Sequence, residues 1–194
     1  DVRWTAHSRR LWIFGNTARD GVFDEDGGRR LIDRRTLIAG LSAALVAPRC
    51  AFAQTIRDAA GRAVKIPAKV SRVFPAGPPA SILLYTLAPD LLIGWARANR
   101  PEECAYMLPD ICTRPEVGRI TGRGNTANLE TVLALKPDLI LDVGSTSATF
   151  VSLADRVQEQ TSIPYALLDG RFASIAATYR TLGTLIGRAD DAEK

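Results

Sequence analysis

A glycine-rich segment, Gly122-Arg123-Gly124-Asn125-Thr126-Ala127, has the spacing of loops that bind the pyrophosphate of a dinucleotide. In such sites the glycines let the backbone approach the phosphates, and an acid about 20 residues later binds the ribose. Asp142 stands at that distance and follows an apolar segment. A Rossmann-type NAD(P)-dependent enzyme that uses the Gly122–Ala127 loop is therefore one hypothesis for this chain.

The surroundings of this loop argue against that hypothesis. A dinucleotide site needs a strand that leads into the first glycine, and residues 116–120 contain only two apolar residues. The helix expected after the loop is about two turns long, which is short for a dinucleotide crossover. We keep the NAD(P)-dependent enzyme as the alternative to a binding protein.

Four arginines fall in expected loops, and their guanidinium groups suit the recognition of carboxylates, phosphates and other oxyanions. Trp95 can supply a flat apolar wall to the same site or pack in the core, and the same holds for Tyr106. The four are Arg97, Arg100, Arg123 and Arg171.

The remaining side chains offer little catalytic chemistry. The only histidine is His7, so the chain beyond residue 53 has no imidazole for a catalytic pair or for a site that binds bare zinc or manganese. We expect no catalytic residue, no resident metal and no cofactor.

The net charge of +4 does not indicate nucleic-acid binding. Residues 1–53 hold 9 of the 25 basic groups and 6 of the 21 acidic groups, so most of the excess lies there. The rest of the chain has no dense basic run, and we expect no nucleic-acid partner.

An export signal is expected near the start. Arg34 and Arg35 open an uncharged apolar run, 37–47, that ends in a small-x-small pattern at Ala53. The adjacent arginines resemble a twin-arginine signal, and the run of about 11 residues is too short for a bilayer span. We assign 1–33 to an unstructured leader and 34–53 to the signal, with cleavage after Ala53 and a periplasmic mature protein; a buried helix with a basic cap is the other interpretation.

From Gln54 onward, apolar runs of strand length alternate with helical patterns. This alternation predicts an α/β fold, a Rossmann-like three-layer lobe with a central, mostly parallel sheet. Ligands of such folds bind beyond the carboxyl ends of the strands. The expected strands are 64–66, 71–74, 91–95, 139–141 and 164–168, and the expected helices are 80–88, 129–135, 150–160 and 175–186.

Cys104 and Cys112 lie in one polar loop. In an oxidising compartment they can form a disulfide, and two unpaired thiols are the other possibility.

The segment from Asn128-Leu129-Glu130 through a leucine-rich turn to Lys136-Pro137-Asp138-Leu139-Ile140 closely resembles the periplasmic binding proteins of ABC importers for ferric siderophores and cobalamin. Flanking segments occur in the same order there, notably Asp90-Leu91-Leu92-Ile93-Gly94 and Pro115-Glu116-Val117-Gly118. The resemblance covers roughly residues 55–194.

The resemblance implies a two-lobed protein, of which 54–187 form the N-terminal lobe and 188–194 begin the helix between the lobes. It implies an ABC importer permease as the partner, with Glu130 as the residue that docks on permease arginines. The ligand expected is an anionic iron complex, a ferric siderophore or haem, or a related cobalamin or oxyanion ligand. We assign its binding to residues in the loops at the cleft end of the sheet: Pro78, Trp95, Arg97, Arg123, Asn125, Ser145 and Arg171.

Overall fold

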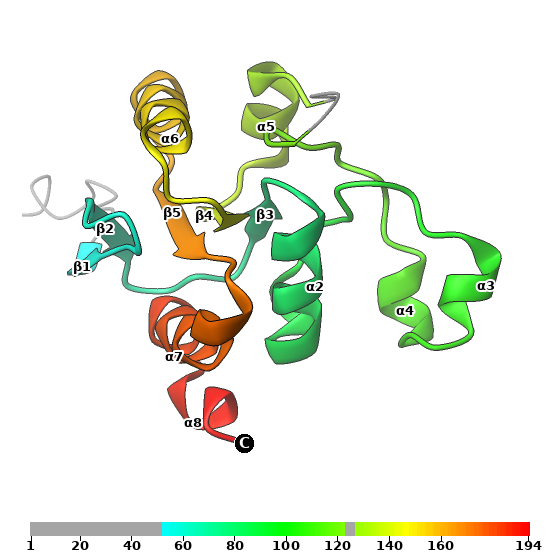
Figure 1. The fold of residues 1–194 in the computed structure, drawn as a ribbon. Helices are drawn as coiled ribbons and strands as arrows, with labels where there is room; N and C mark the ends of the chain where they lie inside the picture. The colour runs from blue at the N-terminus through cyan, green and yellow to red at the C-terminus, as the bar shows by residue number, and fades with distance from the viewer. Residues whose placement is uncertain (1–51, 123–126) are drawn as a thin grey trace, which may run out of the picture. The chain divides into compact units, whose positions relative to one another are not determined.

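The computed structural model describes residues 52–122 and 127–194. A three-stranded parallel sheet, in the order β3-β4-β5, forms the centre of this part of the chain, and a separate antiparallel hairpin joins β1 and β2 (Figure 1). The predicted leader and signal segment lie outside the described residues except for Phe52 and Ala53, which begin β1. The strands are β1 Phe52–Arg57, β2 Ala63–Pro67, β3 Val73–Pro75, β4 Leu139–Gly144 and β5 Tyr165–Asp169.

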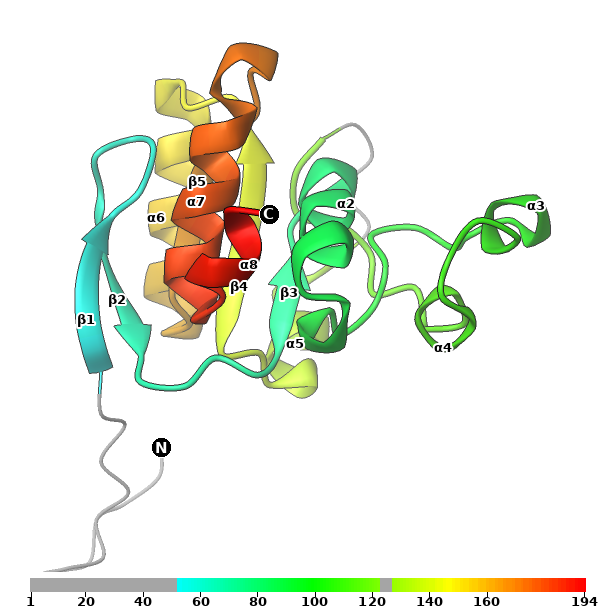
Figure 2. The ribbon, with the colours of Figure 1, turned by 90° about the horizontal axis from the view of Figure 1, so that it is seen from below.

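Helices cover both faces of the parallel sheet, as predicted for a three-layer α/β lobe. α2 and α7 lie on one face, and α5 and α6 lie on the other (Figures 1 and 2). The helices are α2 Pro78–Leu87, α3 Pro101–Cys104, α4 Pro109–Cys112, α5 Leu129–Leu135, α6 Ala148–Thr161, α7 Ile175–Ile186 and α8 Ala189–Ala192, with short 3-10 turns at Pro89–Leu91 and Phe172–Ser174.

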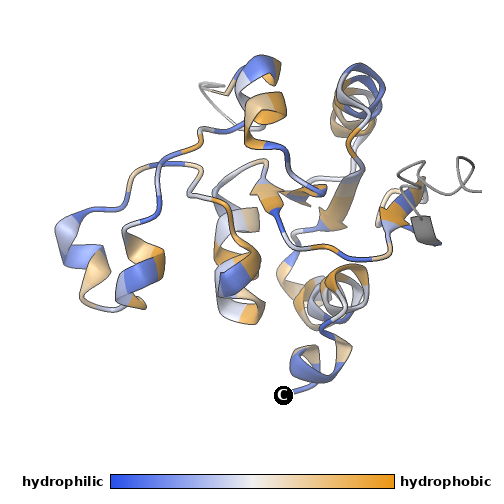
Figure 3. Ribbon diagram, turned by 180° about the vertical axis from the view of Figure 1, so that it is seen from behind, coloured by the Kyte–Doolittle hydropathy of each residue, from blue (hydrophilic) through white to orange (hydrophobic). Residues whose placement is uncertain are grey.

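The two faces have separate cores because successive residues of a strand point to opposite sides. On β4, Leu139 and Leu141 pack with α2 and α7, whereas Ile140 packs with Val132 of α5 and Val157 of α6. Most residues of β4 and β5 are accordingly hydrophobic, while α6 also carries many hydrophilic residues (Figure 3). None of the described helices is both long enough and apolar enough to cross a bilayer.

The ends of the helices follow local sequence signals. Two prolines, Pro78 and Pro79, open α2, where a missing N–H costs nothing. The side chain of Asn128 caps α5 by accepting a hydrogen bond from Thr131 N at 2.7 Å, as predicted. Gly187 ends α7 in the left-handed conformation at φ 70°, which glycine adopts without strain.

The predicted strand at 91–95 is wrong. Leu91 belongs to a 3-10 turn, and only two isolated parallel bridges form in this segment, Val73 with Leu92 and Trp95 with Glu116. Between these bridges the chain changes partners at Gly94, where an added Cβ would lie 2.5 Å from Pro115 O. The continuous apolar run therefore reflects burial under neighbouring loops and not a continuous hydrogen-bonded ladder.

Residues 97–114, which we call the α3–α4 arm, project from the side of α2 (Figures 1 and 2). The arm contains α3 and α4, and a disulfide joins Cys104 to Cys112 between them. The structure thus selects the disulfide from the two states that the sequence left open. Ile111 of α4 packs in the core on the α2 side of the sheet, so one half of the arm is anchored and the other is exposed.

Candidate functional site

The carboxyl ends of β3, β4 and β5 meet at one edge of the sheet, because the strands are parallel. Residues that follow these ends are therefore brought near one another, as expected for a ligand site in an open α/β sheet. Arg123 and Asn125, which we assigned to ligand binding, lie outside the described residues. The other five assigned residues fall into two groups at this edge.

The first group surrounds a small cavity between the start of α2 and the α3–α4 arm. The cavity has a volume of about 80 Å³ and brings together Pro78, Trp95 and Arg97, which lie up to 19 positions apart in the sequence. Clefts that enclose a whole small molecule measure about 300–1,000 Å³, so this cavity has room for no more than one functional group. Its lining is Pro78, Ser81, Ile82, Trp95, Ala96, Arg97, Asn99 and Met107.

Trp95 forms the inner wall of this cavity and is only 4% exposed. Its indole N–H donates to Ile111 O at 2.8 Å, and its ring lies 5.5 Å from that of Tyr85 in a tilted arrangement. These contacts fix the ring, so Trp95 is both a core residue and a wall. Tyr106, the other predicted aromatic wall, is 90% exposed on the arm and does not line the cavity.

Arg97 lies at the mouth of the cavity and is held by a carboxylate of its own chain. Its two terminal nitrogens bind Glu103 at 2.9 and 2.7 Å. The hydrogen bonds from Arg97, and then the one from the backbone N–H of Arg100, lower the pKa of Glu103 to about 2. Both members of the pair are therefore charged at neutral pH, and Glu103 compensates the positive charge of Arg97.

The second group follows β4 and β5. Ser145 is exposed and accepts a hydrogen bond from Ser147 N at 3.2 Å, and Gly170 N donates to Gly144 O at 2.9 Å, which places the two loops side by side. Arg171 is exposed, and its guanidinium binds Asp169 at 2.6 Å. This contact lowers the pKa of Asp169 and raises that of Arg171. Neither Ser145 nor Arg171 lines the cavity of the first group.

Asp142 does not occupy a position suited to a ribose. It is 4% exposed, and it accepts hydrogen bonds from Tyr165 Oη at 3.0 Å and from Thr121 Oγ1 at 3.2 Å. In addition, residues 113–122 contain no strand that leads into Gly122, and α5 has only seven residues. The geometry therefore does not favour the dinucleotide-binding alternative.

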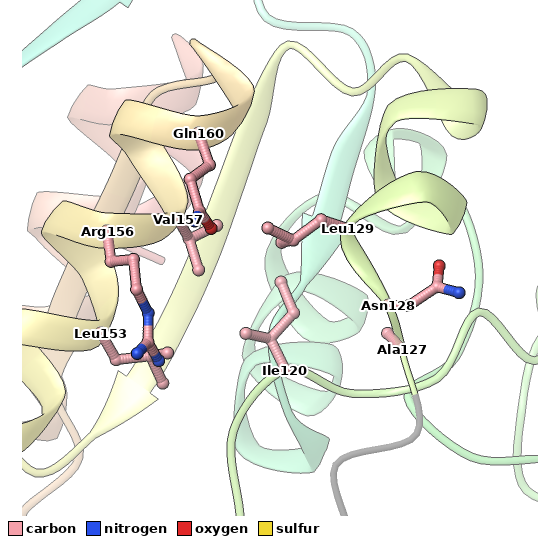
Figure 4. Close-up of a pocket in the computed structure, with 8 residues that line it drawn as sticks. All are labelled: Ile120, Ala127, Asn128, Leu129, Leu153, Arg156, Val157 and Gln160. Atoms are coloured by element: carbon pink, nitrogen blue, oxygen red, sulfur yellow. The ribbon is translucent and has the colours of Figure 1, made fainter. Parts of the chain in front are cut away.

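A larger groove, of about 570 Å³, lies between α5 and α6 and was not foreseen from the sequence. Figure 4 shows side chains of α6 that face α5 across it, with Leu153 and Val157 beside the polar groups of Arg156 and Gln160. Their spacing places them on one face of a helix, which is the sequence signal that could have pointed to this surface. The lining is Ile120, Ala127, Asn128, Leu129, Leu153, Arg156, Val157 and Gln160.

Glu130 follows two of the groove residues, Asn128 and Leu129, in the first turn of α5. It is exposed and has no hydrogen bond or ion pair with any residue that the structure describes. A carboxylate in the first turn of a helix is stabilised by the helix dipole without a further partner. Its side chain is therefore available to a partner protein.

Within residues 52–122 and 127–194, no cluster of three or more histidine, cysteine, aspartate or glutamate side chains could hold a metal ion.

No protein-family model matches this chain, and neither does any curated protein sequence. Solved structures do match. An ABC transporter solute-binding protein from Sulfurospirillum deleyianum has 23% identity and a TM-score of 0.58 over 71% of this chain and 43% of its own. The heme-binding protein HmuT has 21% identity and a TM-score of 0.51 over 72% and 42%. Staphylococcus aureus SirA, solved with staphyloferrin B, has 21% identity and a TM-score of 0.50 over 72% and 44%.

The chain therefore spans less than half the length of each of these structures. Identities of this size establish a shared fold, which agrees with the three-layer architecture described above. This chain has the fold of one lobe of the periplasmic solute-binding proteins of ABC transporters.

Proposed function

We propose that this chain is the N-terminal lobe of an extracytoplasmic solute-binding subunit that captures an anionic iron complex and delivers it to an ABC importer. The observation that carries the proposal is the cavity at the carboxyl edge of the sheet, because it joins an aromatic wall, Trp95, to a guanidinium, Arg97, in a solute-binding fold. The protein binds and releases its ligand without chemical change.

The ligand class follows from the polar groups at this edge. Arg97 and Arg171 both present guanidinium forks, which recognise carboxylates and other planar oxyanions. A ferric siderophore with carboxylate groups has such oxyanions, and so does haem through its propionates. The cavity is too small for either molecule, so we assign to it one anionic arm of the ligand, with the remainder enclosed by a second lobe.

Glu130 is the proposed docking residue for the permease. Replacing Glu130 by arginine is expected to weaken docking and uptake, because it places like charges opposite the arginines of the partner. Glu130→Ala removes only an exposed pair worth about 1 kcal/mol or less, so its effect is a few-fold at most. The loss in Glu130→Arg shrinks at high salt, since salt screens the repulsion.

The measurement is uptake into cells, together with binding of the full-length protein to its purified importer. Glu159→Arg is the matched control, because Glu159 is an exposed glutamate on α6 and its reversal changes the net charge equally. Normal uptake in Glu130→Arg removes the docking role, and lost ligand affinity in Glu130→Ala moves the residue into the ligand site.

The export route is proposed from the sequence and has its own test. Replacing Arg34 and Arg35 by lysines is expected to retain the precursor in the cytoplasm, because the twin-arginine pathway requires the guanidinium pair. Fractionation of cells that express the full-length protein measures this, and sequencing of the exported form is expected to begin at Gln54. Normal export of the lysine variant assigns the protein to general secretion instead.

A further inference from the structure

The guanidinium of Arg97 already binds a carboxylate of its own chain. Arg97 also lines the small cavity, which otherwise suits an anionic group. Both oxygens of Glu103 take part, Oε1 at 2.7 Å from one terminal nitrogen and Oε2 at 2.9 Å from the other. This is the two-pronged geometry by which arginine binds a carboxylate ligand. The chain therefore provides its own carboxylate at the position that a ligand would use.

The position of Glu103 is set by the α3–α4 arm and not by a freely moving loop. Its Oε2 also accepts the backbone N–H of Arg100 at 2.8 Å, which orients the carboxylate at the start of α3. The next residue, Cys104, is bonded to Cys112 of α4, and Cys112 O accepts a hydrogen bond from Asn99 Nδ2 at 3.2 Å. The disulfide thus holds the carboxylate-bearing helix against the half of the arm that is anchored in the lobe.

The pair is nevertheless open to exchange. The side chain of Arg97 is 52% exposed and that of Glu103 is 29% exposed, and ion pairs with this degree of exposure are weak. A ligand can carry one carboxylate and also a second group that fills the cavity. Such a ligand makes contacts that Glu103 does not make, so its carboxylate can replace Glu103 on the guanidinium of Arg97.

We propose that Glu103 is a specificity-determining residue that occupies Arg97, so that a ligand gains the guanidinium only if its oxyanion displaces Glu103. This inference rests on the proposed binding function and adds the selection rule for its site. Neutral ligands leave the Arg97–Glu103 pair in place and gain nothing from the guanidinium. Ligands with several carboxylates displace Glu103 and are selected.

The first test needs no ligand. In the purified full-length protein, the rate at which phenylglyoxal modifies Arg97 is measured by peptide mass spectrometry, with Arg180 as an internal reference because it is also exposed and paired, to Glu193. Glu103→Gln is expected to raise the rate at Arg97 about threefold, since a neutral amide holds the guanidinium less strongly than a carboxylate. Glutamine keeps an oxygen for Arg100 N, so α3 is preserved, and Glu159→Gln controls for the change in net charge.

The second test uses citrate as a multivalent carboxylate probe and glycerol as a neutral one, at constant ionic strength. Citrate is expected to protect Arg97 from phenylglyoxal at about threefold lower concentration in Glu103→Gln than in the unmodified protein. Glycerol is expected to protect Arg97 neither in Glu103→Gln nor in the unmodified protein. An unchanged labelling rate in Glu103→Gln, or citrate protection equal at Arg97 and Arg180, overturns the selection rule. If both tests give the expected results but the protein supports no uptake, the importer role is refuted and the selection rule is not.

Discussion

Replacing Asp58 by alanine is expected to destabilise the lobe by about 3–5 kcal/mol, because it removes the buried partner of the Arg62 ion pair and leaves buried backbone donors without their acceptor. The side chain of Asp58 is fully buried, and that of Arg62 is only 10% exposed. Besides Arg62 Nη1 at 3.0 Å, Asp58 accepts three backbone N–H groups, those of Ala60, Arg62 and Leu167. Truncation leaves the three backbone N–H groups without this acceptor, while Arg62 keeps its bonds to Tyr165 O and Asp155.

The effect is expected to reach beyond the hairpin, because Asp58 connects the β1–β2 turn to β5. Leu167 N donates to Asp58 Oδ2 at 3.3 Å, and Ala59 N donates to Leu167 O at 2.9 Å. The edge of the parallel sheet is thereby closed by the turn of the hairpin. Loss of Asp58 is therefore expected to weaken both the hairpin and its contact with this edge of the sheet.

Asp155→Ala is the matched control for this prediction. Asp155 binds the same guanidinium at 2.8 Å, but its side chain is 62% exposed, so its loss is expected to cost about 1 kcal/mol or less. Urea unfolding followed by circular dichroism measures both variants, and the two midpoints are compared directly. Equal midpoints for Asp58→Ala and Asp155→Ala would show that burial of the pair contributes nothing.

The elements predicted best from the sequence are those whose ends are determined by single residues. Asn128 caps α5 through its own side chain, and Gly187 ends α7 in a conformation that other residues avoid. The buried strands β4 and β5 are also recognisable because both of their faces are covered, so they are apolar at nearly every position. Local chemistry is enough to define such elements.

The errors arise where distant segments decide the outcome. The run 91–95 is as apolar as β4, but it changes hydrogen-bonding partners at Gly94, and only the position of Pro115 in space reveals this. Both described site arginines also look free in the sequence. Their ion pairs with Glu103 and Asp169 depend on side-chain geometry that loop composition does not encode.

Asp142 is a second buried carboxylate, and its contacts connect three segments of the candidate site. It lies on β4, and Thr121 Oγ1 lies within hydrogen-bond distance both of Asp142 Oδ1, at 3.2 Å, and of Ala76 O, at 3.1 Å. An added Cβ on Gly77 would lie only 2.9 Å from the same hydroxyl, so the start of α2 is in close contact with Thr121. Asp142 therefore supports both Thr121 and the entry to α2.

The hydroxyl protons of this network favour a neutral carboxyl, whereas the backbone N–H of Val143 favours the anion. Thr121 has one hydroxyl proton for two acceptors. If Asp142 is protonated, it donates to Thr121 Oγ1, Thr121 donates to Ala76 O, and Tyr165 Oη donates to the other carboxyl oxygen. Burial has the largest effect and raises the pKa of Asp142, against the opposing hydrogen bonds from Tyr165, Thr121 and the backbone N–H of Val143. Burial also raises the pKa of Tyr165.

The sign of the resulting pH dependence follows from this raised pKa. An aspartate in the unfolded chain titrates near pH ~3.9, so above that pH the folded state holds a proton that the unfolded state has lost. Stability from this group is therefore present in full below the unfolded pKa and is lost as the pH rises through the raised pKa of the folded state. Asp169, whose pKa is lowered by Arg171, contributes with the opposite sign.

Asp142→Asn is accordingly expected to keep or increase the stability of the lobe at neutral pH. It is also expected to remove the loss of stability that occurs between the unfolded and the folded pKa of Asp142. The amide imitates the protonated carboxyl, because its N–H donates to Thr121 Oγ1 and its oxygen accepts from Tyr165 Oη. Asp142→Ala leaves both hydroxyls without this partner and is expected to cost about 2–4 kcal/mol. Urea unfolding from about pH 2 to 8 measures the difference between each variant and the unmodified protein, with Asp169→Asn as the control of opposite sign below pH ~3.9. A difference between Asp142→Asn and the unmodified protein that does not change with pH would show that Asp142 is ionised in the folded lobe, with Thr121 donating to it instead of to Ala76 O.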